Sequence, residues 1–157
     1  MRLTTFTDYS LRVLMYLAAE PHRRATIGEI ATAFDISENH LMKVAHSLGK
    51  AGLLISMRGK GGGLELAAAA GSINLGQVIR MTEGPARPAE CFDQAANTCC
   101  ITPACKLRAV LDDAVHAFYT VLDHYTLEDI TRNRNVLARI LAMPRARRAA
   151  PRVLLAP

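Results

Sequence analysis

The sequence predicts a mostly α-helical fold, in which a winged helix-turn-helix with a two-stranded wing is followed by a long dimerisation helix. Three helical patterns occupy the first 50 residues, and a glycine-rich hairpin pattern follows them directly. A long heptad-like pattern begins after residue 102. The chain has 157 residues, of which 50% are hydrophobic, enough for one domain with an added oligomerisation element.

The first two helices are indicated by hydrophobic periodicity. Residues 3–19 repeat hydrophobic side chains at spacings of three and four, and the helix should end at Glu20–Pro21, before the proline. A second helix is expected after Thr26, which can form a capping box with Glu29. Its hydrophobic stripe has i, i+3, i+4, i+7 spacing and consists of Ile27, Ile30, Ala31 and Phe34.

A tight turn and a third helix complete a helix-turn-helix pattern. Asp35–Ile36 form the turn, Ser37 is the expected N-cap of the third helix, and Gly52 is its expected C-terminal glycine. The residues expected to face inward are Leu41, Val44, Ala45 and Leu48. In a helix-turn-helix this second of the two paired helices is the recognition helix.

The wing is predicted by two short hydrophobic stretches on either side of a glycine-rich tip. Leu53–Met57 and Leu64–Ala67 flank Gly59, Lys60 and three consecutive glycines, a pattern typical of a β-hairpin. Three helices and a hairpin within about 65 residues make up a winged helix-turn-helix.

A long helix is expected in the last third of the chain, after a short helix over residues 74–82 and a proline-containing loop. Thr102 is its expected cap, with Pro103 in the first turn. The hydrophobic seam has steps of three and four and consists of Leu107, Leu111, Ala114, Phe118, Val121 and Tyr125. Such a seam favours pairing with a partner helix in a homodimer, and the alternative is packing against its own domain.

These patterns divide the chain into four parts. Residues 1–70 form the winged helix-turn-helix domain, and residues 71–102 contain the short helix and a cysteine-bearing loop. Residues 103–132 contain the dimerisation helix and a short following helix, and residues 133–157 form an Arg-rich tail that is expected to be partly disordered. The tail is either a solvated end or an arm that contacts DNA.

Charge and composition exclude several classes of protein. The net charge is +5, with eight basic and six acidic residues in 1–70, four and eight in 71–131, and seven and none in 132–157. This balance fits an anionic partner such as DNA. Aromatic content of 5% without Trp argues against stacking on single-stranded nucleic acid. We expect no membrane span, and a start without an export signal predicts a cytoplasmic protein.

The candidate DNA contacts lie on the recognition helix and on the wing. The residues on the outward face of the third helix include Asn39, His40 and Lys43. Asn suits adenine and Lys suits guanine or phosphate, whereas His40 alone is equally typical of an ordinary surface. Arg58 and Lys60 lie among glycines, which let the wing approach a groove wall. A dimer of this kind binds approximately palindromic double-stranded DNA.

Four cysteines, Cys91, Cys99, Cys100 and Cys105, lie within fifteen residues. In a reducing compartment such a cluster more often binds metal or senses redox state than forms structural disulfides. The spacing is neither that of a zinc ribbon nor that of a ferredoxin, so an iron–sulfur or zinc site, buried thiols and a redox disulfide remain open. Three thiolates would leave an iron–sulfur cluster one ligand short.

Four segments carry a resemblance to a known family. MRLTTFTDYSLRVLMYLA, ISENHLMKVAHSLGKAGL, RGKGGGLELA and the C-x₇-C-C-x₄-C run before KLRAVLDDAVHAFYTVLDHYTLEDI resemble the NsrR-like regulators, across roughly residues 1–132. These are nitric-oxide-sensing, iron–sulfur, winged-helix repressors. The resemblance implies a [4Fe–4S] cluster, with [2Fe–2S] as the other option, held by Cys91, Cys99 and Cys105. It also implies that Asp8 of the other subunit is the fourth ligand.

The resemblance further implies a homodimeric repressor of operator DNA that releases the DNA when nitric oxide nitrosylates the cluster. The sister IscR-like regulators, which control iron–sulfur biogenesis, have a histidine three residues after the last cysteine, where this chain has Arg108. Two other functions remain open. One is a thiol-redox or zinc-dependent DNA-binding regulator, and the other is an electron-transfer or enzymatic iron–sulfur protein. The chain shows no nucleophile–base constellation, so we expect no enzyme.

Overall fold

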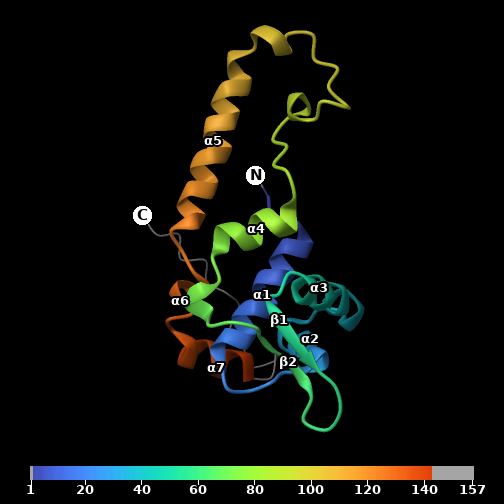
Figure 1. The fold of residues 1–157 in the computed structure, drawn as a ribbon, viewed down its shortest axis with the longest axis vertical. Helices are drawn as coiled ribbons and strands as arrows, with labels where there is room; N and C mark the ends of the chain where they lie inside the picture. Colours follow the sequence, from blue (N-terminus) through green and yellow to red (C-terminus); the bar gives the residue numbers. More distant parts are fainter. Residues whose placement is uncertain (1, 143–157) are drawn as a thin grey trace.

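The computed structural model describes residues 2–142 and shows a mostly helical winged helix with a long helical extension (Figure 1). The winged-helix half contains α1 (Thr5–Ala19), α2 (Ile27–Phe34), α3 (Glu38–Lys50), β1 (Leu54–Met57) and β2 (Gly63–Leu66). The remainder contains η1 (Ala70–Ser72), α4 (Leu75–Glu83), η2 (Glu90–Phe92), η3 (Thr102–Ala104), α5 (Lys106–Asp123), α6 (Leu127–Ile130) and α7 (Arg134–Ala142). None of the described helices is long and apolar enough to cross a membrane.

The helix-turn-helix forms as the sequence predicts. Thr26 accepts a hydrogen bond from the Glu29 N–H and the Glu29 carboxylate bonds back to Thr26, which completes the capping box of α2. Asp35, with φ 58°, turns the chain between α2 and α3. Asp is one of the few residues that adopt this left-handed conformation readily. Ser37 lies at the N-cap of α3, but its side chain makes no capping hydrogen bond.

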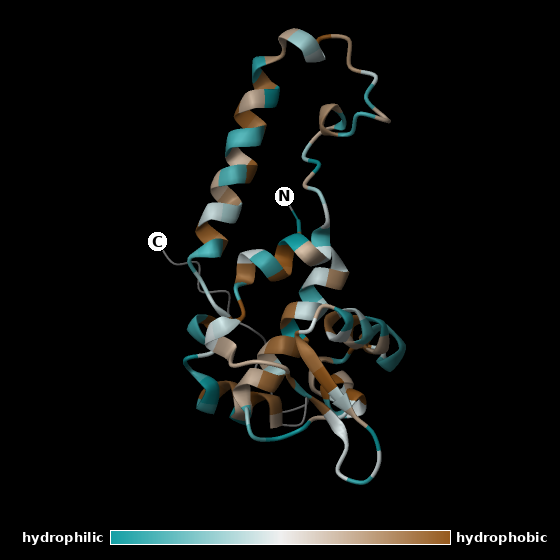
Figure 2. Cartoon of the chain, in the orientation of Figure 1, coloured by the Kyte–Doolittle hydropathy of each residue, from teal (hydrophilic) through white to brown (hydrophobic). Residues whose placement is uncertain are grey.

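The two strands form an antiparallel hairpin in which Leu54 pairs with Leu66 and Met57 with Gly63. The core lies where α1, α2, α3 and the base of this hairpin meet, and Figure 2 shows hydrophobic residues gathered there. Its fully buried side chains include Val13, Leu14, Ile30, Leu41 and Leu48. Leu127 of α6 is also fully buried, so the C-terminal segment contributes to the same core.

A long extension leaves this core at α4 and returns to it through α5. We call residues 84–105 the cysteine loop, and the cysteine loop together with α5 the arm. In Figure 1 the cysteine loop lies at one end of the molecule, and the β1–β2 wing lies at the opposite end. The two features that the sequence singled out are therefore far apart within one chain.

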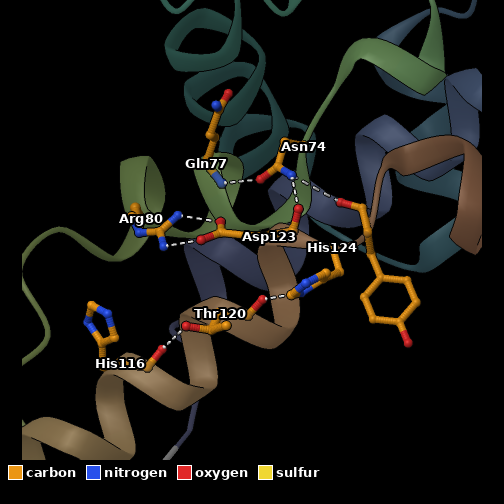
Figure 3. A network of polar contacts seen from close by, with 8 residues as sticks. Asn74, Gln77, Arg80, His116, Thr120, Asp123 and His124 are labelled. Carbon is orange, nitrogen blue, oxygen red and sulfur yellow. Dashed lines mark hydrogen bonds and ion pairs between the residues drawn. The ribbon is translucent and has the colours of Figure 1, made fainter.

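A compact polar network joins the start of α4 to the end of α5 (Figure 3). Asn74 caps α4 through its Oδ1, while its Nδ2 donates to the Asp123 carbonyl at 2.7 Å. Backbone bonds from Leu75 to Tyr125 and from Leu127 to Ile73 pair the two segments, at 3.0 and 2.8 Å. Arg80 makes two bonds of 2.6 Å to the Asp123 carboxylate, which lower the pKa of Asp123. These contacts fix where α5 returns to the domain.

Two expectations about the C-terminal third were wrong. Thr102 and Pro103 begin the short η3 turn, and α5 begins only at Lys106, because the backbone at Cys105 is extended. Tyr125, assigned to the helical seam, lies beyond the end of α5. The first part of the Arg-rich tail forms α7, which packs against α1, and the expected partial disorder of the tail stays a prediction. Residues 143–157 of the tail lie outside the described residues.

Candidate functional site

The recognition helix presents one buried face and one polar face. Leu41, Val44 and Leu48 of α3 are buried in the core. Asn39, His40 and Lys43 are all exposed; Asn39 and Lys43, four residues apart, lie on the face opposite the buried one, and His40 lies beside them. The structure therefore leaves these three predicted contacts accessible to a ligand.

His40 also contacts α1 within the same chain. Its ring centroid lies 6.3 Å from that of Tyr9, with a tilt of 43° between the rings. Such an aromatic contact couples the first turns of α1 and α3. His40 therefore packs the recognition helix against α1, a contact that hydrophobic periodicity does not reveal.

The wing presents Arg58 and Lys60 at an exposed, glycine-built tip. A Cβ on Gly62 would lie 2.4 Å from the Met57 carbonyl oxygen, so the tight return of the hairpin requires glycine there. The base of the wing is tied to the α1–α2 connection by the Arg24–Glu65 ion pair at 2.9 Å and by backbone pairing of Ala25 with Leu64. A basic tip therefore extends from a fixed base.

All four cysteines are free thiols on the cysteine loop. Cys91 lies in η2 and Cys105 at the N-cap of α5, and both are half-buried, as is Cys99. Cys100 is exposed. The three cysteines that the resemblance implies as ligands thus share an environment that differs from that of the fourth.

Cys99 is held by a small polar turn. Asn97 Oδ1 accepts the Cys99 N–H at 3.1 Å, and the Thr102 hydroxyl donates to the Cys99 carbonyl at 2.8 Å. Asn97 Nδ2 donates to the same hydroxyl at 3.1 Å, and the Cys105 N–H bonds to the Thr102 carbonyl at 3.4 Å. Thr102 therefore links Cys99 with Cys105, a role that its interpretation as a helix cap missed.

Asp8 lies in the first turn of α1, where it pairs with Arg12. The two carboxylate oxygens of Asp8 lie 3.1 and 2.8 Å from Arg12 Nε and Nη2, and both side chains are roughly 40% exposed. The Arg12 guanidinium lies 5.8 Å from the centroid of the Phe34 ring, at the end of α2. Asp8 is therefore connected through Arg12 to the helix-turn-helix.

The root of the cysteine loop is fastened to the start of α1. The Glu83 carboxylate accepts hydrogen bonds from the Thr4 N–H and hydroxyl at 2.7 and 2.9 Å. The Thr7 hydroxyl donates to the Thr82 hydroxyl at 2.9 Å. Burial alone would raise the pKa of Glu83, but hydrogen bonds from the Thr7 and Thr4 groups outweigh it and lower that pKa. Neither contact was predicted, because the partners are 75 and 79 residues apart.

The chemistry of these donors fits an iron–sulfur cluster with one external ligand. Three half-buried thiols on one loop are soft donors suited to iron or zinc. Over residues 2–142 no three Cys, His, Asp or Glu side chains of one chain converge closely enough to hold a metal ion. Asp8 does not form such a group with the cysteines of its own chain either. The donors are thus suitable in kind, but in the described part of one chain they do not converge into a site.

Comparison with known proteins identifies the family. The Rrf2 family, described as iron-dependent transcriptional regulators, matches residues 3–133. The chain belongs to the Rrf2 family. Among curated relatives, the transcriptional regulator NsrR of Bacillus subtilis strain 168 is 46% identical over 144 residues, covering 91% of this chain and 99% of that protein. NsrR of Shouchella clausii is 44% identical, covering 90% of this chain and 95% of that protein.

Solved structures of similar proteins confirm the winged-helix fold of this Rrf2 chain. CymR, the global cysteine regulator of B. subtilis, is 29% identical with a TM-score of 0.65, covering 85% of this chain and 98% of its own. IscR of T. potens is 24% identical with a TM-score of 0.69, covering 96% of this chain and 94% of its own, a likeness of fold alone. This Rrf2 protein is a transcriptional regulator and not an enzyme, as the sequence predicted.

Proposed function

We propose that this Rrf2 regulator is a cytoplasmic, nitric-oxide-responsive repressor that binds palindromic operator DNA as an iron–sulfur-loaded homodimer. The observation that carries the proposal is the set of three half-buried free thiols on one loop of a chain 46% identical to an NsrR. Cys91, Cys99 and Cys105 hold the cluster, and Asp8 of the partner subunit completes it. A [4Fe–4S] cluster is the favoured form. A cluster held there supplies iron atoms that react with nitric oxide.

Asp8 has two competing interactions in this proposal. It either ligates iron of the neighbouring subunit or pairs with Arg12 of its own α1, as in the structure. Arg12 lies over Phe34 of α2, and Tyr9, next to Asp8, contacts His40 of α3. An exchange of partner at Asp8 therefore acts on the helix that reads DNA, which is how a local change of ligand becomes a change in affinity.

The exposed side of α5 supports the dimer. Leu107, Val110 and Val121 are each about 60% exposed, although they are large hydrophobic residues. Beside α5 lies a cavity of about 670 Å³, lined on one side by Leu111, Val115, Phe118 and Tyr119 and on the other by Glu83 and residues 85–88. Large hydrophobic side chains exposed along one helix face are typical of an interaction surface, and a second copy of α5 would cover them.

The DNA contacts follow from the exposed polar groups. Asn39, His40 and Lys43 of each recognition helix contact the major groove, and Arg58 and Lys60 of each wing contact phosphates or a minor groove. Two winged helix-turn-helix domains related by a dimer axis require an approximately palindromic DNA site. The phosphate contacts make the affinity for DNA strongly salt-dependent.

The proposal is tested on protein purified without oxygen. Iron, sulfide and the visible absorption spectrum are measured, followed by operator binding before and after stoichiometric nitric oxide. We expect loaded protein to bind and nitrosylated protein to release the operator. Cys91→Ser, Cys99→Ser and Cys105→Ser should each lose iron, and Cys100→Ser is the matched control that should keep it. Operator affinity that nitric oxide leaves unchanged would contradict the proposal.

A thiol-redox regulator is the second candidate, favoured by the exposed Cys100 beside Cys99 in a loop of four free thiols. The same preparation distinguishes the two functions. A colourless, iron-free protein whose operator affinity changes with a thiol oxidant would support the second candidate and exclude the first.

A further inference from the structure

Arg108 connects the two ends of the cysteine loop. It lies in the first turn of α5, three residues after Cys105, so the two residues share one side of the helix start. Its Nε donates a hydrogen bond to the Cys91 carbonyl oxygen at 3.3 Å. Its guanidinium carbon lies 5.4 Å from the centroid of the Phe92 ring. One side chain thus holds the η2 turn by a hydrogen bond and by a cation–π contact.

Other contacts in the cysteine loop act over shorter stretches of chain. Arg87 pairs with Asp93, and Asn97 with Thr102. Arg108 instead spans seventeen residues, from the helix that begins at Cys105 back to the turn that contains Cys91. When Cys91 and Cys105 bind one group, the loop between them loses conformational freedom, which weakens binding. A contact that already closes the loop restricts it beforehand, so less conformational freedom is lost on binding.

We propose that Arg108 is a positioning residue that presents Cys91 beside Cys105 before either thiol binds a ligand. It touches the backbone of Cys91 and the ring of Phe92, not the sulfur atoms. The planar guanidinium suits this role because it can stack on the ring while an N–H points in its plane toward the carbonyl. The inference rests on the proposed function in assigning Cys91 and Cys105 to one cluster, but pre-positioning of the two thiols is a property of the chain alone.

The first test measures the cluster-free protein. In a Cys99→Ser, Cys100→Ser background, the effective concentration of the Cys91–Cys105 thiol pair is measured by equilibration with reduced and oxidised glutathione. Arg108→Gln should lower this effective concentration about threefold to tenfold, as expected for an exposed hydrogen bond and cation–π contact. The matched control is Lys106→Gln, which removes the same charge from the same turn and should change nothing.

The second test measures the loaded protein. Arg108→Gln should shorten the lifetime of the bound cluster against a ferrous chelator by a similar factor and alter its visible circular dichroism. Lys106→Gln should do neither. Arg108→Lys should recover part of the lifetime, because an ammonium group can still donate to the carbonyl. In a Phe92→Leu background, Arg108→Gln should have a smaller effect, because Phe92→Leu already removes the cation–π contact of Arg108.

The two tests separate this inference from the proposed function. Equal results for Arg108→Gln and Lys106→Gln in both tests would overturn the inference, even if the native protein binds its cluster. A native protein without iron would overturn the proposed function, while a lowered effective concentration in cluster-free Arg108→Gln would still support the positioning role.

Discussion

Glu83 shows how a single residue can connect two functional parts of this chain. Its carboxylate bonds to the N-cap of α1, one turn before Asp8, and the cysteine loop begins at the next residue. Glu83 therefore fixes the root of the cysteine loop to the helix that contains the proposed partner-subunit ligand.

Replacing Glu83 with Gln should destabilise the fold by about 1 kcal/mol at neutral pH, because charged acceptors make stronger hydrogen bonds than neutral ones. The folded-state pKa of Glu83 is below its ordinary value of 4.5. The contribution of the ionised Glu83 carboxylate to folding stability is therefore complete above about pH 4.5 and is lost as the pH falls through the lower folded-state pKa. Urea unfolding of wild type and Glu83→Gln at about pH 7 and pH 3 measures the difference.

The matched control is Asp112→Asn, which removes one exposed carboxylate from α5. It should leave stability nearly unchanged at both pH values. A gap between wild type and Glu83→Gln that stays constant down to about pH 3 would contradict the assigned role of the ionised carboxylate.

Residue roles could be predicted from the sequence where the partners are close along the chain. The Thr26–Glu29 capping box and the turn at Asp35–Ile36 follow from local chemistry and are confirmed. The Glu83–Thr4 contact and the Tyr9–His40 contact join distant segments, and no local pattern predicts them. The assignments of Asn39, Lys43 and the cysteines to DNA and metal remain predictions, because the structure contains neither ligand.

At the scale of elements, the junction between α3 and β1 sets the angle between the recognition helix and the wing. The Leu53 N–H bonds to the Leu48 carbonyl and the Gly52 N–H to the Gly49 carbonyl, which together form a Schellman motif. Gly52 has φ 72°, where a residue with a side chain is strained. The predicted C-terminal glycine is thus confirmed, with a specific conformation.

Gly52→Ala should destabilise the protein by about 1 kcal/mol through backbone strain alone, because a Cβ there meets no atom within 4 Å. Gly49→Ala is the matched control. Gly49 lies inside α3, where its Cβ would lie 3.9 Å from the Leu54 carbonyl oxygen, and alanine should stabilise the helix by up to about 1 kcal/mol. Urea midpoints that move in the same direction for both variants would disprove this account.

The recognition helix and the wing should differ in what they contribute to DNA binding. Asn39→Ala should cost about 1–3 kcal/mol on the operator and relax its sequence preference, because a base contact is lost. Lys60→Ala should weaken binding to operator and scrambled DNA alike, and lower the salt slope by about 1. Fluorescence anisotropy at several salt concentrations distinguishes the two. If Asn39→Ala loses equal affinity for operator and scrambled DNA, Asn39 does not contact the bases.

Element boundaries were predictable where capping signals are strong and unpredictable where the chain bends without one. The start of α5 was placed at Thr102 from its cap-like Thr-Pro pair, but the Thr102 hydroxyl bonds to Cys99 instead. Competition between a helix and a local side-chain bond is a general property of Thr. The first part of the tail became α7 because the surface of α1 was available for packing, which the composition of the tail does not reveal.

At the scale of the whole molecule, α5 separates two surfaces. One side joins α4 through Arg80, Asp123 and Tyr119, and the other exposes large hydrophobic residues. His116 lies on the Asp123 side of α5, where its carbonyl oxygen accepts a hydrogen bond from the Thr120 hydroxyl at 2.9 Å (Figure 3). This asymmetry of a single helix predicts assembly with a second chain.

Val121→Glu should weaken the dimer at least about tenfold, because it places a charge in an apolar interface, while the isolated chain should remain folded. His116→Glu, a similar change on the opposite side of the helix, is the control and should leave the assembly unchanged. Analytical ultracentrifugation of both proteins measures the effect. If Val121→Glu remains dimeric at the concentration where wild type does, the interface lies elsewhere.

The Asn74 network binds the start of α4 to the residues after α5, so the polypeptide between these points begins and ends at nearly the same place. α4 packs on α1 and contributes Val78 to the core, so the part of this segment that can change in length or composition without rebuilding the domain is the arm that follows Glu83. If the arm binds the signal, as the proposed function holds, exchange of this one insert adapts the scaffold to a new chemical signal while the promoter it regulates stays the same.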